Sequence, residues 1–127
     1  MGNLERLVTE QNVWLATTRP DGRPHVVPIW FLFEDERFWI CTGADSVKVR
    51  NLHVNASASV SLEDGNNPAV AEGVAAFVAK PYPQPVVAGF QRKYRWDIEA
   101  DDDPDLGITA LFVVTVSRWL MGNPIPD

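Results

Sequence analysis

Two strand-like runs joined by a tight turn form the feature that most constrains the fold of this chain. Residues 13–18 and 24–33 are rich in β-favouring side chains, and Pro20, Asp21 and Gly22 between them are typical of a hairpin turn. The two runs are therefore predicted to pair as antiparallel neighbours. Pro28 has no N–H group to donate, so the ladder is expected to be open or bulged at that position of the second strand.

Four further runs are predicted to be strands, at residues 38–42, 57–63, 69–79 and 108–119. Short helices are expected at residues 3–11, from about 45 to 54, and at 86–94. A parallel sheet would need a helix between almost every pair of strands, and this chain has too few. The prediction is therefore a single domain over residues 1–127, mainly β, in which six antiparallel strands form a small barrel with short peripheral helices.

Composition narrows the kind of partner that such a domain can bind. The chain has 127 residues, of which 46% are hydrophobic, and its net charge is −6. An acidic protein is a poor general surface for nucleic acid or an anionic membrane, so neither is expected as a partner. No secretory signal or membrane span is found, which favours a cytoplasmic location. One cysteine and two distant histidines make a metal site improbable.

Hydroxyl and cationic side chains cluster directly after the third predicted strand. Thr42, Ser46, Lys48 and Arg50 surround the expected start of a helix. A helix N-terminus presents free N–H groups and a positive dipole end, so these side chains together could enclose one phosphate group. The alternative is structural: Ser46 caps the helix, while Lys48 and Arg50 are solvated surface residues. Spacing by itself leaves both interpretations open.

An aromatic group accompanies this candidate anion site. Its members are Trp30, Phe31, Phe33, Trp39, Trp96 and Trp119. Core packing explains most large rings in a small barrel, but flat rings beside an anion site also suit a planar heterocycle. His25 is equally compatible with a surface position and with a position facing a ligand.

Several common functional motifs are absent. The chain has no Gly-x-Ser-x-Gly elbow, no phosphate-binding P-loop and no Gly-x-Gly-x-x-Gly fingerprint, which argues against a serine hydrolase, a nucleotide triphosphatase and a Rossmann dehydrogenase. The acidic segment 97–105 lacks the spacing of a calcium loop and is expected to be a solvated loop without a function. No side chain is a convincing general acid, so no catalytic residue is assigned.

Four segments in this order resemble the flavin and deazaflavin oxidoreductases of split-barrel fold, the superfamily related to pyridoxamine 5′-phosphate oxidase. They are residues 15–25, Pro28 to Phe31, Thr42 to Leu52, and Val70 to Ala75. Their order and spacing are similar to those of the short proteins described as probable coenzyme F-420-dependent enzymes. The family often has a further basic residue before the lysine, where this chain has Val47.

The resemblance implies an FMN-binding split barrel that forms a homodimer, with the cofactor in a groove between the subunits. By position, the phosphate end of the cofactor would be held by Thr42, Ser46, Lys48 and Asn51. The ring would be lined by the backbone and side chains of a second set, His25, Val26, Val27 and Pro28.

The function expected from this resemblance is oxidoreduction with a flavin-type cofactor, F-420 being preferred. A hydride would pass between the cofactor and a small unsaturated or heteroaromatic substrate. One alternative is an FMN-dependent oxidoreductase of the pyridoxamine 5′-phosphate oxidase type, and the other is a non-catalytic flavin carrier. Retention of FMN on purification would favour the FMN-dependent oxidoreductase. Binding without turnover would favour the carrier.

Overall fold

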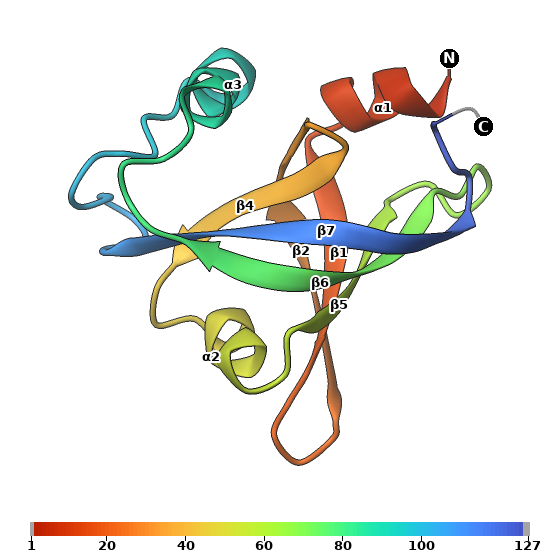
Figure 1. Ribbon diagram of the computed structural model, residues 1–127, viewed down its shortest axis with the longest axis horizontal. Helices are drawn as coiled ribbons and strands as arrows, with labels where there is room; N and C mark the ends of the chain where they lie inside the picture. The colour runs from red at the N-terminus through yellow and green to blue at the C-terminus, as the bar shows by residue number, and fades with distance from the viewer. Residues whose placement is uncertain (1, 126–127) are drawn as a thin grey trace.

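The computed structural model of the chain describes residues 2–125, which form one antiparallel sheet with three helices around it (Figure 1). The order of strands across the sheet is β2-β1-β5-β6-β7-β4-β3. In chain order the elements are α1 (Asn3–Thr9), β1 (Asn12–Thr18), β2 (Pro24–Trp30), β3 (Leu32–Glu34), β4 (Arg37–Gly43), α2 (Val47–Val54), β5 (Ser57–Leu62), β6 (Val70–Val78), α3 (Gln84–Tyr94) and β7 (Thr109–Met121).

The predicted count of six strands is wrong, because the second predicted strand is broken in two. Residues 24–33 were expected to be continuous, but β2 ends at Trp30 and β3 begins at Leu32. The two strands lie at opposite ends of the strand order, although only Phe31 separates them. The chain thus leaves one edge of the sheet and joins the other, which requires the sheet to curl.

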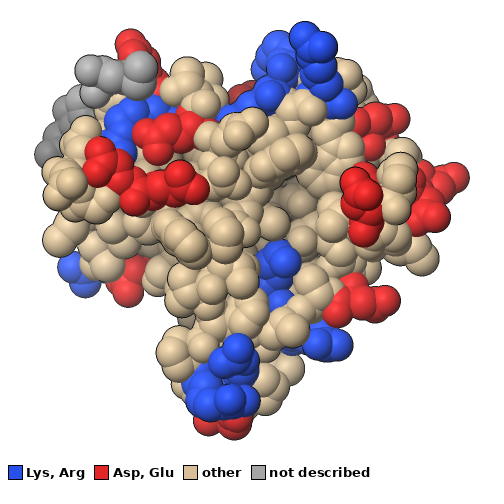
Figure 2. Space-filling model, turned by 180° about the vertical axis from the view of Figure 1, so that it is seen from behind, with Lys and Arg blue, Asp and Glu red and all other residues tan. Residues whose placement is uncertain are grey.

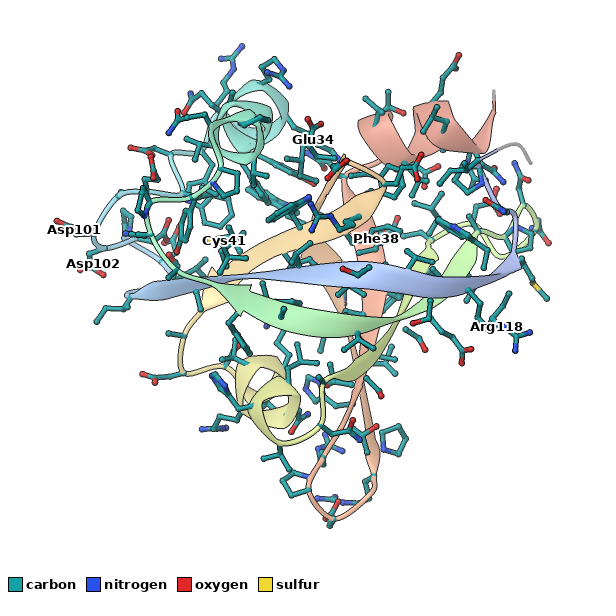
Figure 3. All side chains as sticks on the ribbon, viewed as in Figure 1. Glu34, Phe38, Cys41, Asp101, Asp102 and Arg118 are labelled. Atoms are coloured by element: carbon teal, nitrogen blue, oxygen red, sulfur yellow. The ribbon has the colours of Figure 1, made fainter. Side chains whose placement is uncertain are left out.

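The curled sheet is a half-barrel of the split-barrel class, and its inner face carries the main core. Fully buried rings and branched side chains fill the interior, among them Phe31, Phe38, Ile40, Phe112 and Val60. Figure 3 labels Phe38, which lies on β4. Burial of such side chains is the principal stabilising contribution in a domain of this size.

The helices lie outside the sheet, as predicted, although α1 ends at Thr9 rather than at residue 11. Helix α3 covers a second apolar cluster that includes Tyr82, Val86, Phe90 and Ile98. Figure 1 shows α3 and α1 on one side of the strands and α2 on the other. The hairpin of β1 and β2 pairs as predicted, and its register runs without a bulge past Pro28, which lies opposite Trp14 on an edge strand. An edge is where a strand tolerates proline.

The outer face of the sheet carries exposed apolar side chains. Trp14 and Pro28 share this face with Val26 and Trp30, which follow the same alternation along β2, and Val74 lies two strands away on β6. Three of these side chains, Val26, Trp30 and Val74, are 42% to 55% exposed. Contiguous apolar surface of this kind commonly marks an interface.

Candidate functional site

Ser46 lies at the N-terminus of α2 but does not cap it. Its φ and ψ angles are those of an N-cap residue, yet its side chain makes no capping hydrogen bond. Among residues 2–125 its Oγ is buried and has no hydrogen-bond partner. Buried hydroxyl groups are nearly always hydrogen-bonded, so this unpaired hydroxyl at the positive end of a helix is available to hydrogen-bond a ligand.

Two further residues of the predicted site, His25 and Lys48, lie close enough for the charge of Lys48 to act on His25. The Nδ1 atom of His25 is also buried without a partner in the described part of the chain. Burial lowers the pKa of His25, and the positive charges of Arg19 and Lys48 lower it further. Burial likewise lowers the pKa of Lys48. His25 therefore lies near two positive charges and has a ring nitrogen without a hydrogen-bond partner. These two features suit a place where an anion binds.

Arginine side chains line a hollow between α2 and the β1–β2 turn, with a volume of about 390 Å³. Arg19 and Arg23 reach it from the β1–β2 turn, and Arg50 reaches it from the helix. Asp21 forms an ion pair with Arg23 at 2.8 Å, which leaves the hollow with a net positive charge. Figure 2 shows Lys and Arg side chains gathered over the hairpin and α2, apart from a second group over α3.

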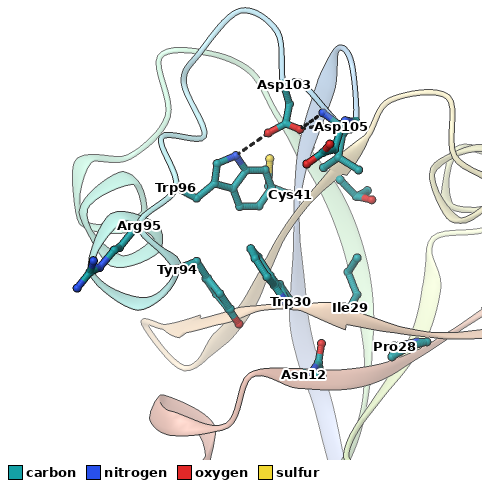
Figure 4. A pocket seen from close by; sticks show the side chains of 12 residues that line it. Asn12, Pro28, Ile29, Trp30, Cys41, Tyr94, Arg95, Trp96, Asp103 and Asp105 are labelled. Atoms are coloured by element: carbon teal, nitrogen blue, oxygen red, sulfur yellow. Dashed lines mark hydrogen bonds between the residues drawn. The ribbon is translucent and has the colours of Figure 1, made fainter.

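An aromatic pocket of about 530 Å³ opens between β2 and the segment after α3 (Figure 4). Trp30 stacks on Tyr94 with ring centroids 4.4 Å apart and planes 9° from parallel. Trp96 meets Trp30 edge to face at 6.1 Å. Pro28 and Thr42 lie in the same lining. The pocket therefore has a flat aromatic wall and reaches the strand that leads to α2.

The acidic loop after α3 holds one of these rings in place. Asp103 accepts a hydrogen bond from the indole N–H of Trp96 at 3.1 Å. Its other carboxylate oxygen accepts the backbone N–H groups of Asp105 and Leu106, both at 2.9 Å. These bonds lower the pKa of Asp103 and keep it ionised. Much of the loop is exposed, as predicted, but Asp103 is a structural part of the pocket wall.

A hydrogen-bonded clasp holds the crossing from β2 to β3 beside the pocket. The hydroxyl of Tyr94 accepts the backbone N–H of Phe31 at 3.0 Å. The same oxygen lies 2.7 Å from the carbonyl of Gln11 and 2.9 Å from that of Phe31, and its one proton serves one of them at a time. Lys93 Nζ donates to the Phe31 carbonyl at 3.0 Å. The aromatic wall and the strand break thus depend on the same helix.

The structure places the residues predicted to bind the phosphate in two settings. Ser46 and Lys48 lie at the start of α2, and Thr42 lines the aromatic pocket nearby. Asn51 instead uses its side-chain N–H to bond Thr17 Oγ1 at 3.1 Å, and both residues are buried. That bond fastens α2 to β1, which gives Asn51 a structural task.

The residues predicted to line the ring follow the alternation of β2. His25 and Val27 are half-buried on one face, whereas Val26 and Pro28 are exposed on the other. Of these four, Pro28 contributes to the aromatic pocket. A ligand that runs along this edge strand would meet the side chains of one face and the backbone of all four residues.

Sequence reasoning gave no site role to Arg19, Tyr94 or Asp103. Arg19 follows the first strand of the hairpin, and a basic residue beside a turn has no distinctive pattern. Tyr94 lies in the helix predicted at residues 86–94, and Asp103 lies in the segment predicted to be a solvated loop. The roles of Tyr94 and Asp103 depend on contacts with Phe31 and Trp96, which no local periodicity reveals.

The curled antiparallel sheet with its three outer helices defines a protein of the split-barrel class. The sequence model of pyridoxamine 5′-phosphate oxidase matches residues 3–121. The chain therefore belongs to the pyridoxamine 5′-phosphate oxidase family. No curated protein sequence is significantly similar to it.

Solved structures of similar fold differ in what they bind. An F420 reductase is 24% identical, with 91% of this chain and 93% of that chain covered and a TM-score of 0.69. HutZ, the heme storage protein from Vibrio cholerae, is 21% identical over 91% and 89% of the two chains, with a TM-score of 0.74. A putative pyridoxamine 5′-phosphate oxidase from Listeria innocua is 14% identical over 92% of each, with a TM-score of 0.69. At these identities the likeness shows the fold alone.

Among the described residues, none of the helices has the length and apolar character needed to cross a membrane.

Proposed function

We propose that this protein is an oxidoreductase that binds a flavin-type cofactor, with F-420 preferred, and passes a hydride between it and a small unsaturated or heteroaromatic molecule. The single observation that carries the proposal is the buried, unpaired Ser46 Oγ at the start of α2. Membership of the pyridoxamine 5′-phosphate oxidase family supports it. The bound cofactor would supply the redox chemistry, while the protein would position it and exclude water.

The residues present fit a phosphate-bearing cofactor. Ser46 Oγ and the N–H groups of the first turn of α2 would donate to the phosphate, and Lys48 would supply its positive charge. His25 offers an unpaired buried nitrogen beside Lys48. Ser46 and His25 are left with unsatisfied polar atoms by the fold itself, and a bound phosphate would satisfy them.

The arginine hollow favours F-420 over FMN. Both cofactors carry one phosphate, but F-420 extends beyond it into a tail of glutamate carboxylates. Arg19, Arg23 and Arg50 line one hollow beside α2, and a tail that ran from the phosphate into this hollow would meet all three. The overall charge of −6 repels anions, so a local group of cations is needed to bind them. The cations of α3 lie elsewhere, and of these Arg95 alone reaches the aromatic pocket.

FMN remains the alternative cofactor because the same phosphate site would hold it. An FMN oxidoreductase of the pyridoxamine 5′-phosphate oxidase type would need Ser46 and Lys48 but not the arginine hollow. A flavin carrier would bind the cofactor and transfer no hydride. These functions differ in their dependence on Arg50 and on an acceptor substrate.

We further propose that the protein acts in the cytoplasm as a homodimer, with the groove completed by a second copy. The exposed apolar side chains Trp14, Val26 and Val74 on the outer face of the sheet support this assembly. Burying them between two copies would remove a patch that is costly to expose to water. Trp30 belongs both to this face and to the aromatic pocket, so the dimer contact would adjoin the cofactor groove.

The Ser46→Ala variant separates a phosphate site from an ordinary helix cap. Loss of a true cap would lower the free energy of unfolding by about 1 kcal/mol. Because Ser46 makes no capping bond, the variant is expected to keep the stability of the natural protein and to bind both F-420 and FMN about tenfold more weakly. The opposite pattern, lower stability with unchanged affinity, would identify Ser46 as a cap.

The Arg50→Ala variant tests the choice of cofactor. It is expected to weaken binding of F-420 by about tenfold and to leave FMN binding unchanged. Calorimetric titration of both variants with both cofactors measures these effects. Turnover is then followed optically by mixing reduced F-420 with an unsaturated ketone or a nitroaromatic acceptor. Binding without oxidation of the cofactor by any acceptor would support the carrier.

A further inference from the structure

One wall of the aromatic pocket combines flat rings with negative charge. Trp30 is 42% exposed and keeps its stacked orientation through Tyr94. Trp96 is held at right angles to Phe90, with centroids 5.8 Å apart, and by its bond to Asp103. Rings fixed by their neighbours lose little entropy when a planar ligand stacks on them.

Two carboxylates adjoin these rings. Asp103 and Asp105 both line the pocket, and Figure 4 shows them on the side where Trp96 lies. The Asp103 carboxylate is fixed by three hydrogen bonds, from Trp96, Asp105 and Leu106. The Asp105 carboxylate makes no hydrogen bond or ion pair within residues 2–125 and is free to meet a ligand. The side chain of Arg95 points away from the rings in Figure 4, so it does not neutralise the two carboxylates.

We propose that this wall is the substrate subsite and that it takes a planar heteroaromatic cation, stacked on one of the two indole rings with its positive charge toward Asp103 and Asp105. The proposal rests on the proposed function, because it treats the Pro28 side of the same pocket, on β2, as the place of the cofactor ring.

The chemistry of the wall selects a cation over other planar molecules. The faces of indole rings are electron-rich and attract positive charge within about 6 Å of their centroids. Carboxylates at the rim add direct attraction for a cation and repel an anion. An uncharged aromatic molecule would gain the stacking alone. In this proposal the cations of α2 would bind the anionic end of the cofactor, and the carboxylates of the pocket wall would face the substrate.

Calorimetric titration of the full chain with three isosteric probes tests this preference without any cofactor. The probes are N-methylquinolinium, quinoline and quinoline-2-carboxylate, at neutral pH and low salt. The cation is expected to bind about tenfold more tightly than neutral quinoline, and the anion more weakly than both.

Variants show whether the preference comes from this wall. Asp105→Asn is expected to reduce the preference for the cation about threefold, and Asp103→Asn with Asp105→Asn to abolish it. Asp101→Asn with Asp102→Asn is the matched control, because these exposed carboxylates lie in the same loop but do not line the pocket and project outward in Figure 3. This control is expected to keep the full preference.

Equal binding of the three probes, stronger binding of the anion, binding of none of them, or an equal loss in the control variant would overturn the inference. If the cation preference is present but neither F-420 nor FMN binds, the cation subsite stands and the proposed oxidoreductase does not. If a cofactor binds and the preference is absent, the inference about the substrate fails by itself.

Discussion

Replacing Tyr94 with phenylalanine tests how the barrel strand is broken at Phe31. The change removes one hydroxyl and keeps the ring that stacks on Trp30. That hydroxyl accepts the N–H of Phe31, a residue with no exposed surface, and donates to the carbonyl of Gln11 or Phe31. In the variant the Phe31 N–H is buried without an acceptor, whereas the Phe31 carbonyl keeps Lys93 and the exposed Gln11 keeps access to water.

The expected cost follows from these contacts. A buried unsatisfied donor costs about 1–3 kcal/mol, and the donated bond contributes about 1 kcal/mol more. We therefore expect the Tyr94→Phe variant to lose about 2–4 kcal/mol of unfolding free energy, which corresponds to a fall in Tm of roughly 8–16 °C for a chain of this length. Urea unfolding followed by tryptophan fluorescence and by circular dichroism measures the loss, with an unchanged denaturant slope.

Tyr82→Phe is the matched control. Tyr82 is also buried, but its hydroxyl makes no hydrogen bond within residues 2–125, so the same chemical change is expected to alter stability by less than about 0.5 kcal/mol. A loss below about 0.5 kcal/mol in Tyr94→Phe as well would refute the clasp as the reason for the strand break.

Three further predictions concern packing and ionisation. A Cβ atom at Gly73 would overlap the backbone of β7, so Gly73→Ala is expected to cost about 2–3 kcal/mol in urea unfolding; an unchanged midpoint would show that β6 can shift away. Asn51→Ala and Thr17→Ala each break a buried bond, and a double-mutant cycle is expected to give about 1 kcal/mol of coupling, whereas additive losses would exclude that bond. Burial lowers the pKa of Lys93 from 10.5 to about 8, and Glu10 opposes this effect. Between pH 8 and 10.5 the unfolded chain therefore binds more protons than the folded one, so stability is expected to rise with pH above about 8. The rise, about 1–2 kcal/mol for this partly exposed amine, should be absent from the unfolding curves of Lys93→Met; a parallel rise in both would assign it to other groups.

Local patterns predicted most strands because their causes are local. The turn at Asp21 and Gly22 and the alternation at residues 57–63 determine which strands form, and the structure confirms both. The break at Phe31 has no such signal, since residues 24–33 have continuous β character. It depends on Tyr94, which is distant in the sequence and arrives on a helix.

The candidate site also combines residues that local sequence patterns indicate with contacts that only the fold creates. The cluster of Ser46 and Lys48 was visible in the sequence, but spacing could not separate a helix cap from an anion site. The structure shows that Ser46 makes no capping hydrogen bond, which supports the proposed anion site, and this is a property of three-dimensional packing. The role of Asp103 also depends on the distance to Trp96, which composition does not contain.

The most direct test of the central claim is a parallel titration of the purified protein with F-420 and FMN, repeated on Lys48→Ala. A phosphate held by this ammonium group predicts tighter binding of F-420 in the natural protein and a loss of about tenfold to a hundredfold for both cofactors in the variant. Stability should not fall in the variant, because burial disfavours the charge of Lys48. Equal affinity in both proteins, or binding of neither cofactor, would contradict a cofactor phosphate site at the start of α2.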